Sequence, residues 1–244
     1  MKSNIKKSLH SDRTFDIIVN LLGALVILIV LVPLIFVLAA SFSDPDLVIK
    51  GKVLFLPKGF TTKAYTMVFE NQDIWRGFRN SCFYTIAGTA ISVVLTILAA
   101  YPLSRKELAG RNIIMMLILF TMYFSGGMIP TYLLVKDLGM YNTIWALLIP
   151  AALSTYNLIV AKTFFENSIP GELYESARLD GCGNFPMLTK IVLPLSKAIL
   201  AVLMLYYAVG IWNAYFDALI YLRDTQLHPL QIVLRNILLL GQTE

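Results

Sequence analysis

The chain has 244 residues, of which 57% are hydrophobic and only 14% are charged. A soluble domain carries about one quarter charged residues, so this composition is typical of a membrane protein and argues against a soluble globule. The net charge of +5 could suggest nucleic-acid binding. The basic residues are scattered among the polar segments, however, instead of lying on one stripe with aromatic residues, so no nucleic-acid partner is expected.

Five uncharged runs mark the predicted transmembrane helices. Each run lacks Asp, Glu, Lys and Arg, and the runs are 19 to 27 residues long, whereas a helix needs about 20 residues to cross a bilayer. They predict one all-α transmembrane bundle over residues 1–244, because strands of a membrane barrel would be shorter and would alternate in polarity. With Pro194 opening the last one, the predicted spans are residues 17–43, 80–104, 112–135, 138–161 and 194–216.

The basic residues predict the orientation of these spans, because short basic segments stay in the cytoplasm. The tail before the first span holds Lys2, Lys6, Lys7 and Arg13, and three basic residues lie within residues 105–111. We therefore expect a multi-pass plasma-membrane protein with a cytoplasmic N terminus. Residues 162–193 then form a cytoplasmic loop. The predicted outer loop, residues 43–79, also holds six basic residues, but long loops cross the membrane largely regardless of charge.

Several kinds of functional residue are missing from the sequence. None of the five uncharged runs contains a charged residue or histidine, which disfavours a proton-coupled carrier, although sodium sites built from backbone carbonyls stay open. No phosphate-binding loop, nucleophile-elbow motif or metalloprotease motif occurs. Two cysteines and two histidines, distant from one another in the sequence, predict no metal site. If the bundle moves a solute uphill, the energy must come from a partner.

The loop over residues 162–193 predicts two short helices around a glycine. Pro170 suits the start of the first helix, and Glu172 and Glu175 lie in its early turns, where carboxylates complement the helix dipole. Gly181 is expected in the left-handed conformation that ends a helix. By pattern alone, this loop is an amphipathic connector resting on the lipid headgroups.

The residues of this loop also carry a family resemblance. Glu175-Ser176-Ala177 is followed after three residues by Gly181, and after nine more by Ile191-Val192-Leu193-Pro194. This pattern resembles the EAA loop of importer-type ABC transporter permeases, which reads Glu-Ala-Ala, three residues, Gly, nine residues, Ile-x-Leu-Pro. Ser176 replaces the second-position alanine, a departure of one hydroxyl group.

Other segments are similar to the MalG-like carbohydrate-uptake permeases within that family, and the similarity covers nearly the whole chain. Two further segments, residues 124–131 and 138–143, resemble the branch found in oligosaccharide importers of Gram-positive bacteria. The matching motifs are Asn80-Ser81, Ala99-Ala100-Tyr101, Ser104-Arg105, Gly110-Arg111, Trp212-Asn213 and Pro229-Leu230.

The resemblance implies a type I ABC importer permease that is not itself an enzyme. Its expected partners are a second, homologous permease chain, two ATPase subunits, an extracellular solute-binding protein and an oligosaccharide. ATP and magnesium would bind the ATPase, and this chain would bind no cofactor. A sixth span is expected beyond Glu244, because permeases of this type usually return to the cytoplasm. The residues implied in coupling to the ATPase are Glu172, Glu175, Ala177, Arg178, Asp180, Gly181, Ile191, Leu193 and Pro194.

Polar residues near the predicted spans are candidates for the solute pathway. Tyr206, Gly210, Asn213 and Asp217 follow the i, i+4, i+7, i+11 spacing that places them on one helix face. Such a stripe faces protein or water rather than lipid, and contact with a partner permease or with a sugar would explain it equally. Tyr156 and Asn157, near the inner end of the fourth predicted span, are candidates for the same reason.

Three alternatives stay open at this point. A standalone secondary carrier or channel would work in vesicles without an ATPase. An ABC permease for a solute other than a sugar would share the EAA loop. An intramembrane hydrolase is the most distant alternative, and it would retain activity as a purified chain without nucleotide.

Overall fold

The computed structural model describes residues 2–240, with side chains for Arg13 and for residues 15–239. Within this range all regular elements are helices, which confirms the predicted fold class. The chain divides after Asn71 into two compact units, which are described separately. Lys2, Lys6 and Lys7, on which the predicted orientation depends, lie outside the described side chains, as does Glu244, beyond which a sixth span was expected.

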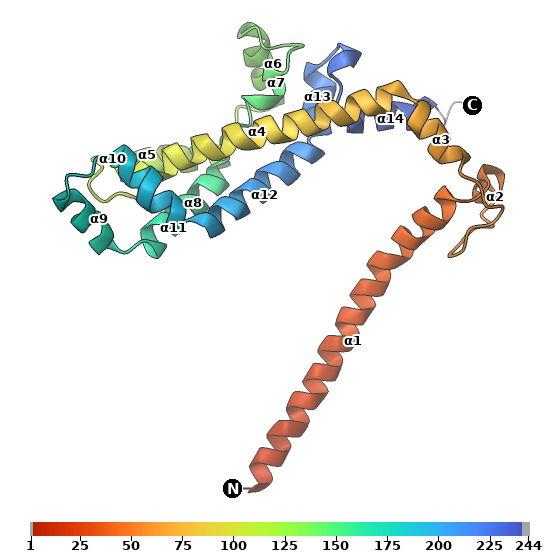
Figure 1. Cartoon of the computed structure of the whole chain (residues 1–244), viewed down its shortest axis with the longest axis horizontal. Coiled ribbons are helices and arrows are strands. Elements are labelled where there is room, and N and C mark those ends of the chain that lie inside the picture. Colours follow the sequence, from red (N-terminus) through yellow and green to blue (C-terminus); the bar gives the residue numbers. More distant parts are fainter. Residues whose placement is uncertain (1, 241–244) are drawn as a thin grey trace. The chain divides into compact units, whose positions relative to one another are not determined.

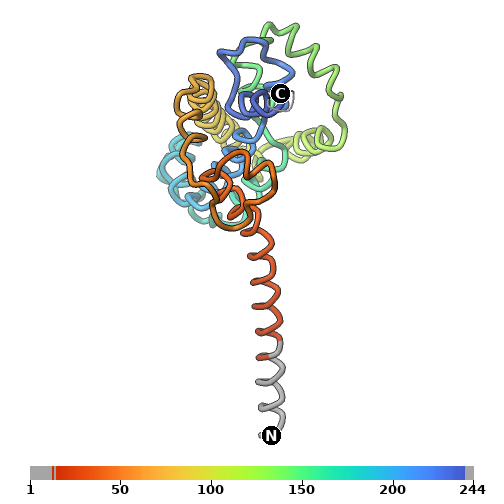
Figure 2. The backbone as a smooth tube through the Cα atoms, turned by 90° about the vertical axis from the view of Figure 1, so that its right-hand side faces the viewer, coloured from red at the N-terminus to blue at the C-terminus, as the bar shows by residue number. Residues whose placement is uncertain are grey.

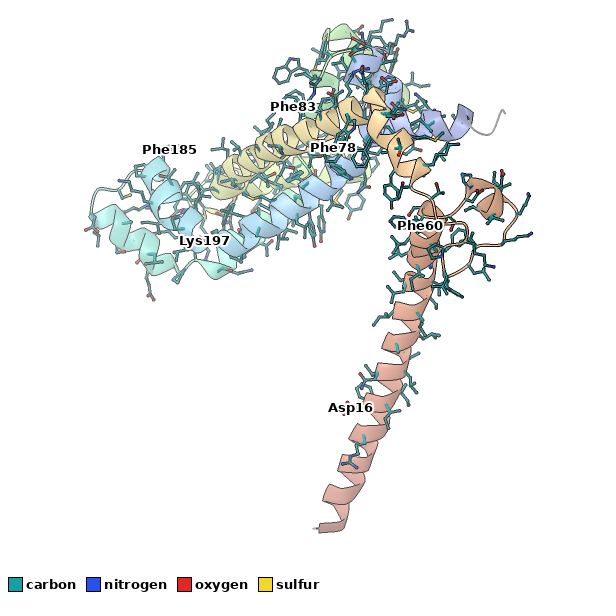
Figure 3. All side chains as sticks on the ribbon, turned by 45° about the vertical axis from the view of Figure 1, so that its right-hand side comes forward. Asp16, Phe60, Phe78, Phe83, Phe185 and Lys197 are labelled. Atoms are coloured by element: carbon teal, nitrogen blue, oxygen red, sulfur yellow. The ribbon has the colours of Figure 1, made fainter. Side chains whose placement is uncertain are left out.

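The first unit holds one long helix and two short ones. Helix α1 (Lys2–Ser41) is long and apolar enough over Phe15–Ser41 to cross a membrane, and its side chains project freely from it (Figure 3). Helices α2 (Pro45–Ile49) and α3 (Lys63–Glu70) follow. The Phe42 ring stacks on that of Phe60 at 5.7 Å. The apolar surface of α1 suits lipid or a partner helix.

Helix α4 (Gln72–Ser104) is the central element of the second unit, and it too is long and apolar enough to span a membrane. Helices α8 (Thr155–Ser168), α12 (Lys197–Asn213) and α14 (Leu230–Leu240) pack along it (Figures 1 and 2). The helix begins eight residues before the predicted Asn80. The absence of charge defines a segment that lipid tolerates, whereas a helix also accepts charged residues such as Arg76, which pairs with Asp73 at 2.9 Å.

The core of this unit lies where α4, α8 and α12 meet. Leu158 and Leu203 have no exposed surface, and Phe165 is 1% exposed. The Thr96 hydroxyl and the Tyr207 phenol form a hydrogen bond of 2.6 Å between α4 and α12. A Cβ on Gly88 would lie 2.8 Å from Ile211 Cδ1, so the absence of a side chain at Gly88 lets the two helices approach this closely.

The third predicted span, residues 112–135, is broken. Helices α5 (Arg111–Tyr123) and α6 (Met128–Asp137) meet at an angle of 113°. Gly127 has a φ of +87°, a backbone conformation that side chains disfavour, and it lies just before α6. The pair is either one broken span or a re-entrant segment.

The fourth predicted span, residues 138–161, is also interrupted. Its first half holds only the four-residue helix α7 (Trp145–Leu148), and α8 begins at Thr155 after a Ser154 cap. Gly139 and Asn142 have positive φ values, and Pro150 lacks the N–H group that a helix interior requires. The segment is uncharged, but its backbone conformations prevent one long helix.

The fifth predicted span, residues 194–216, begins later and ends earlier in the structure. Pro194 lies in the short helix α11 (Leu193–Leu195), and α12 starts at Lys197 after an 84° bend at Ser196. Helix α12 ends at Asn213, and α13 (Tyr215–Tyr221) and the 3₁₀ turn η2 (Thr225–Leu227) follow. Pro194 therefore precedes a bend and does not open the long helix as predicted.

Hydrogen bonds fasten the start of α4 to the segment before α14. The Asn80 amide donates to the carbonyls of Gln226 and His228, at 2.7 and 3.1 Å. The Ser81 hydroxyl accepts the Leu230 N–H at 2.9 Å. These hydrogen bonds thus join the Asn80-Ser81 and Pro229-Leu230 motifs, which lie about 150 residues apart in the sequence.

Candidate functional site

Helix α9 (Gly171–Leu179) forms the first half of the loop over residues 162–193. Only two side chains of this helix are buried, those of Tyr174 and Ala177. Its other side chains are exposed, among them Glu172 and Glu175, and Leu179 is 90% exposed. Leu173 is exposed as well, although its i, i+4 spacing from Ala177 predicts that the two side chains share a face. The helix therefore presents an exposed face of acidic and apolar residues.

The end of α9 is a Schellman turn centred on Gly181. The Gly181 N–H donates to the Arg178 carbonyl at 3.0 Å, and the Cys182 N–H donates to the Ala177 carbonyl at 2.8 Å. Gly181 has a φ of +72°, which confirms the predicted left-handed position. A Cβ there would meet nothing within 4 Å, so the constraint on this residue comes from its backbone alone.

The second half of the loop returns the chain to the bundle. Helix α10 (Asn184–Met187) is followed by the π-helical turn η1 (Leu188–Val192) and by α11. Gly183, not Asn184, occupies the position before α10. Ile191 and Leu193 pack against the main core, which holds this half of the loop in place. The nine implied coupling residues thus lie on two different parts of one helix-turn-helix.

A polar cluster joins α9 to the segment that follows α4. The Arg105 guanidinium lies 3.4 Å from the centre of the buried Tyr174 ring, a cation–π contact. Glu107 Oε1 accepts from Arg105 Nη2 and from Arg178 Nη1, each at 3.1 Å. The Arg105 side chain is 15% exposed, whereas Glu107 and Arg178 are about half exposed. We call Arg105, Glu107, Tyr174 and Arg178 the α4–α9 cluster.

The pKa values of two members of the cluster are shifted from their ordinary values. A hydrogen bond to its own backbone N–H, and then the nearby Arg105 and Arg178, hold the pKa of the Glu107 carboxyl below its ordinary value, although partial burial opposes them. Burial raises the pKa of the Tyr174 phenol, against a smaller opposing effect of Arg105. At neutral pH, Glu107 is therefore a carboxylate and Tyr174 a neutral phenol.

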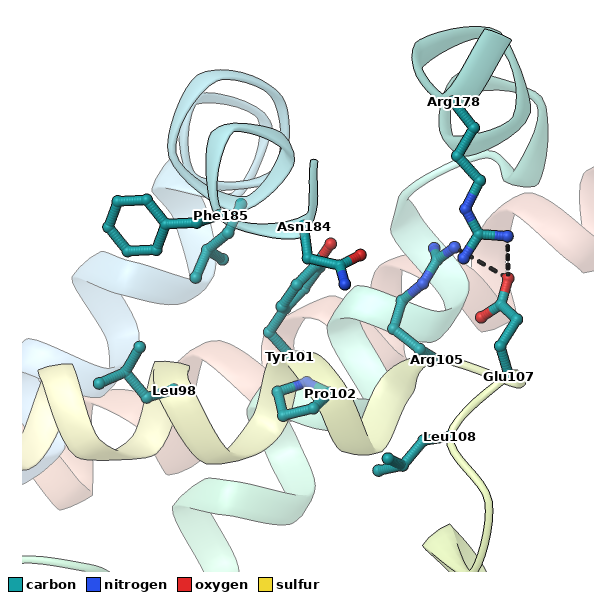
Figure 4. Close-up of a pocket in the computed structure, with 10 residues that line it drawn as sticks. Leu98, Tyr101, Pro102, Arg105, Glu107, Leu108, Arg178, Asn184 and Phe185 are labelled. Carbon is teal, nitrogen blue, oxygen red and sulfur yellow. Dashed lines mark hydrogen bonds and ion pairs between the residues drawn. The ribbon is translucent and has the colours of Figure 1, made fainter. Parts of the chain in front are cut away.

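Sequence reasoning missed most of this cluster. It named Arg178, but it cited Arg105 only as part of a family motif and did not consider Glu107 or Tyr174 at all. The available signal was the Arg-x-Glu spacing directly after a long apolar run. Next to the cluster, an apolar pocket of 440 Å³ lies between the end of α4 and α10, with Leu98, Leu108 and Phe185 among its walls (Figure 4).

Glu175 and Asp180 differ from the members of this cluster. Neither carboxylate has a hydrogen-bond or ion-pair partner within the described residues. Glu175 lines a groove of 280 Å³ together with Lys106 and Arg178. The Glu175 carboxylate is therefore available for contact with another protein. It lies beside basic residues, on a helix that only a few side chains hold to the bundle.

The pathway candidates partly converge on a second site. Asn157 and Tyr206 line a cavity of 260 Å³ bounded by α4, α8, α12 and α13, and Asp217 lines it too. The ring of Tyr156 lies 6.5 Å from that of Tyr206. Asn213 does not line the cavity, and its amide donates to the Val209 carbonyl of its own helix at 2.8 Å. The predicted stripe is therefore divided, with Asn213 outside.

No metal-binding cluster of three or more His, Cys, Asp or Glu residues occurs among the described residues. Cys82 and Cys182 are both free thiols.

Comparison with known proteins gives consistent matches. Residues 92–237 match the family model described as "Binding-protein-dependent transport system inner membrane component". The chain is 44% identical to the polygalacturonan/rhamnogalacturonan transport system permease protein YtcP of Bacillus subtilis (strain 168), over 94% of this chain and 80% of that protein. It is 43% identical to protein LplC of the same organism, over 95% of this chain and 78% of that one.

A solved structure is similar as well. A chain from the crystal structure of a bacterial ABC transporter involved in the import of the acidic polysaccharide alginate matches with a TM-score of 0.88 and 35% sequence identity. The match covers 93% of this chain and 80% of that one. Likeness at this level extends to the arrangement of the helices as well as to the sequence motifs.

Proposed function

Because the chain belongs to the family of binding-protein-dependent transport system inner membrane components, we propose that it forms half of the pathway of an ATP-driven oligosaccharide importer. It is a membrane-embedded, non-catalytic ABC transporter permease with an all-α type I importer fold. Relatives named for polygalacturonan, rhamnogalacturonan and alginate support a saccharide as the solute. The other half of the pathway belongs to a second, homologous permease chain.

The observation that carries the coupling proposal is the construction of α9. Its exposed face offers Glu172, Glu175 and Leu179 to a partner, while Tyr174 and Ala177 hold it to the bundle. An ATPase subunit that grips this face moves α9 when it closes on ATP. The movement passes through the α4–α9 cluster to α4, which packs on α8 and α12. Rigid-body rocking of those helices would alternate the access of the pathway between the two sides.

The partners follow from this arrangement. Two ATPase subunits bind ATP and magnesium and grip the coupling loops, and an extracellular binding protein delivers the saccharide. The N terminus and residues 162–193 face the cytoplasm in this proposal, since the ATPase acts there. The apolar side chains exposed along α1 and α5 contact lipid or the second permease.

The alternatives make different predictions. A standalone carrier or channel requires no ATPase, and an ABC permease for another solute shares α9 but not the saccharide. Membership of a non-catalytic permease family leaves no support for an intramembrane hydrolase.

The test begins with a tagged chain purified from native membranes. A second permease and a P-loop ATPase should co-purify with it. The complex is then placed in proteoliposomes with its binding protein, and uptake of a labelled oligogalacturonide is measured with ATP inside. Uptake should stop when the phosphate-loop lysine of the ATPase is replaced. Uptake that continues without ATP would favour the carrier, and ATP-driven uptake of only a non-saccharide solute would refute the proposed substrate class.

A further inference from the structure

The apolar pocket of 440 Å³ at the end of α4 lies where the chain changes from apolar to charged. Leu98 and Pro102 line it from α4, a helix that is long and apolar enough to span a membrane. Arg105 and Glu107, which follow directly after that helix, line it as well. The pocket therefore reaches from a segment that suits lipid chains to a segment that suits headgroups and water.

One polar group in this pocket has no partner in the described part of the chain. Tyr101 is 7% exposed, and its phenol oxygen is buried without a hydrogen bond. The side chain extends from α4 towards α10 (Figure 4). Because burying a hydroxyl group without a partner costs free energy, binding of a ligand that accepts this hydrogen bond is favoured.

The charged side chains of the pocket leave one positive charge in excess. Arg105, Arg178 and Glu107 are the charged residues that line it within the described part of the chain, so two guanidinium groups face one carboxylate. Both guanidinium groups donate to the same oxygen of Glu107, at 3.1 Å each. A guanidinium has five N–H donors, so each retains donors for a second acceptor. The pocket is therefore complementary to an anion with several oxygen atoms, such as a phosphate group.

The remaining walls of the pocket are mainly apolar. Leu98, Leu108 and Leu188 line it, and so does Phe185 of α10, which is 69% exposed. A free phosphate ion would leave these walls uncovered, whereas a phospholipid brings a phosphate and apolar acyl chains together. Basic pockets between transmembrane helices bind the headgroups of anionic lipids. A headgroup with one net negative charge also matches the single excess positive charge better than a zwitterionic headgroup does.

We propose that this pocket binds one anionic phospholipid, with its phosphate on Arg105 and Arg178 and its acyl chains along the apolar walls. The Tyr101 hydroxyl donates to an oxygen of the lipid headgroup. Because the two arginines also belong to the α4–α9 cluster, the bound lipid links α4 to α9 and α10. The inference requires only that the chain lies in a membrane, so it is independent of the transported solute.

Photo-crosslinking locates the lipid on the chain. The chain is purified from native membranes together with the chains that accompany it. It is then placed in phosphatidylcholine nanodiscs with a trace of phosphatidylglycerol that carries a diazirine in its acyl chain. After illumination, mass spectrometry should find cross-links at residues 98–108 and 184–188. Unlabelled phosphatidylglycerol should compete at a mole fraction at least about fivefold lower than that of phosphatidylethanolamine, a zwitterionic lipid.

A soluble competitor separates a lipid site from a site for free phosphate. Inorganic phosphate at millimolar concentration should leave the cross-links unchanged, because it makes no contact with the apolar walls. If phosphate competes as strongly as phosphatidylglycerol, the pocket is an anion site and the lipid assignment is wrong.

Two pairs of variants assign the effect to the pocket. Tyr101→Phe removes only the unpaired hydroxyl, so half-maximal cross-linking should need at least about threefold more of the photoactivatable lipid. Tyr174→Phe removes another buried, unpaired phenol hydroxyl, from a residue that does not line this pocket, and should have no effect. Arg178→Gln removes the excess charge, so the preference for phosphatidylglycerol should fall to about twofold or less. Arg111→Gln removes a charge outside the pocket and should retain the preference.

The outcomes decide this proposal without reference to transport. Cross-links outside the two segments, equal competition by the two lipids, or equal behaviour of Tyr101→Phe and Tyr174→Phe would each overturn it. Normal recovery of the accompanying chains shows that a variant is folded. ATP-driven uptake of a saccharide tests the proposed function separately, so either proposal can fail alone.

Discussion

The coupling loop, residues 162–193, and the cavity differ in how some of their polar side chains are paired. Next to the coupling loop, Arg105 and Arg178 share one oxygen of Glu107. In the cavity, Asn157 and Asp217 have no partner in the described structure. Both regions belong to one helical unit, and both lie against α4.

This difference separates paired groups, which hold a shape, from unpaired groups, which are open to new contacts. Partly exposed ion pairs add little stability, roughly 0.2–1 kcal/mol each, but they fix the geometry between two elements. We therefore expect substitutions near the coupling loop to change the transmission of motion, and substitutions in the cavity to change recognition.

Glu175 is an exception in the coupling loop, because its carboxylate is unpaired, and its substitution should give the largest effect. If Glu175 meets a basic group of the ATPase, Glu175→Lys replaces attraction by repulsion and should weaken assembly by several kcal/mol. Assembly is measured by recovery of the ATPase with the tagged permease at low and moderate salt. A compensating charge change on the ATPase should partly restore it.

Asp46→Lys is the matched control for this substitution. Asp46 is an exposed acidic residue in α2, in the predicted outer loop, and its substitution by Lys changes the net charge by the same amount. It should leave recovery of the ATPase unchanged. If Glu175→Lys behaves the same way, within about 0.5 kcal/mol, Glu175 is a solvated helix residue and the charge contact is wrong.

Gly181→Val should have the next largest effect. A β-branched residue at a φ of +72° costs roughly 1–3 kcal/mol, so the turn would reshape and α9 would change its angle to α10. We expect saccharide-stimulated ATP hydrolysis to fall sharply while the protein still inserts into the membrane. The measurement is the ATPase rate of the purified complex with and without saccharide and binding protein.

Two further variants show whether strain is the cause. Gly181→Asn should retain most coupling, since asparagine tolerates the left-handed conformation. Gly51→Val introduces similar strain at a φ of +65° in the first unit and should not reduce coupling. Normal stimulation in Gly181→Val would remove the turn from the coupling mechanism.

The sequence predicted features that depend on neighbouring residues. The left-handed Gly181 followed from a helix pattern that ends within a few positions, and α1 and α4 followed from long uncharged runs. The uncharged run over residues 138–161 does not form one helix, because the absence of charge reports compatibility with lipid and not backbone conformation. Positive φ at Gly139 and Asn142 is a local backbone property that hydropathy does not register.

Features that join distant segments could not be predicted in this way. Arg105 meets Tyr174 only because the end of α4 and α9 fold together, and no periodicity links residues 69 positions apart. The cavity likewise collects Asn157 and Asp217 from different helices. The stripe on one helix face indicated some of its members but could not show that Asn213 points elsewhere.

Arg105 should give the third largest effect and tests whether the α4–α9 cluster transmits motion. Arg105→Lys keeps the charge but loses the planar contact with Tyr174, a contact worth about 0.5–2 kcal/mol. The saccharide taken up per ATP hydrolysed should fall while ATPase recovery stays normal. Tyr174→Phe keeps the ring and should couple normally. Equal loss in both variants would indicate a role for the phenol instead of the cation–π contact.

The smallest effect is expected from the ion pair between Glu107 and Arg178. Glu107→Arg or Arg178→Glu should each lower the saccharide taken up per ATP slightly, and the double variant should recover part of it, corresponding to a coupling energy of about 0.2–1 kcal/mol. Higher salt should reduce this coupling energy, because both side chains are about half exposed.

The pH dependence of this coupling energy follows from the lowered pKa of Glu107. A carboxyl with a lowered pKa contributes its full stabilisation above its ordinary pKa and loses it as the pH falls through the lowered value. The coupling energy should therefore be constant from neutral to mildly acidic pH. A coupling energy that disappears in that range, or a double variant no better than either single one, would show that the two side chains do not act as a pair.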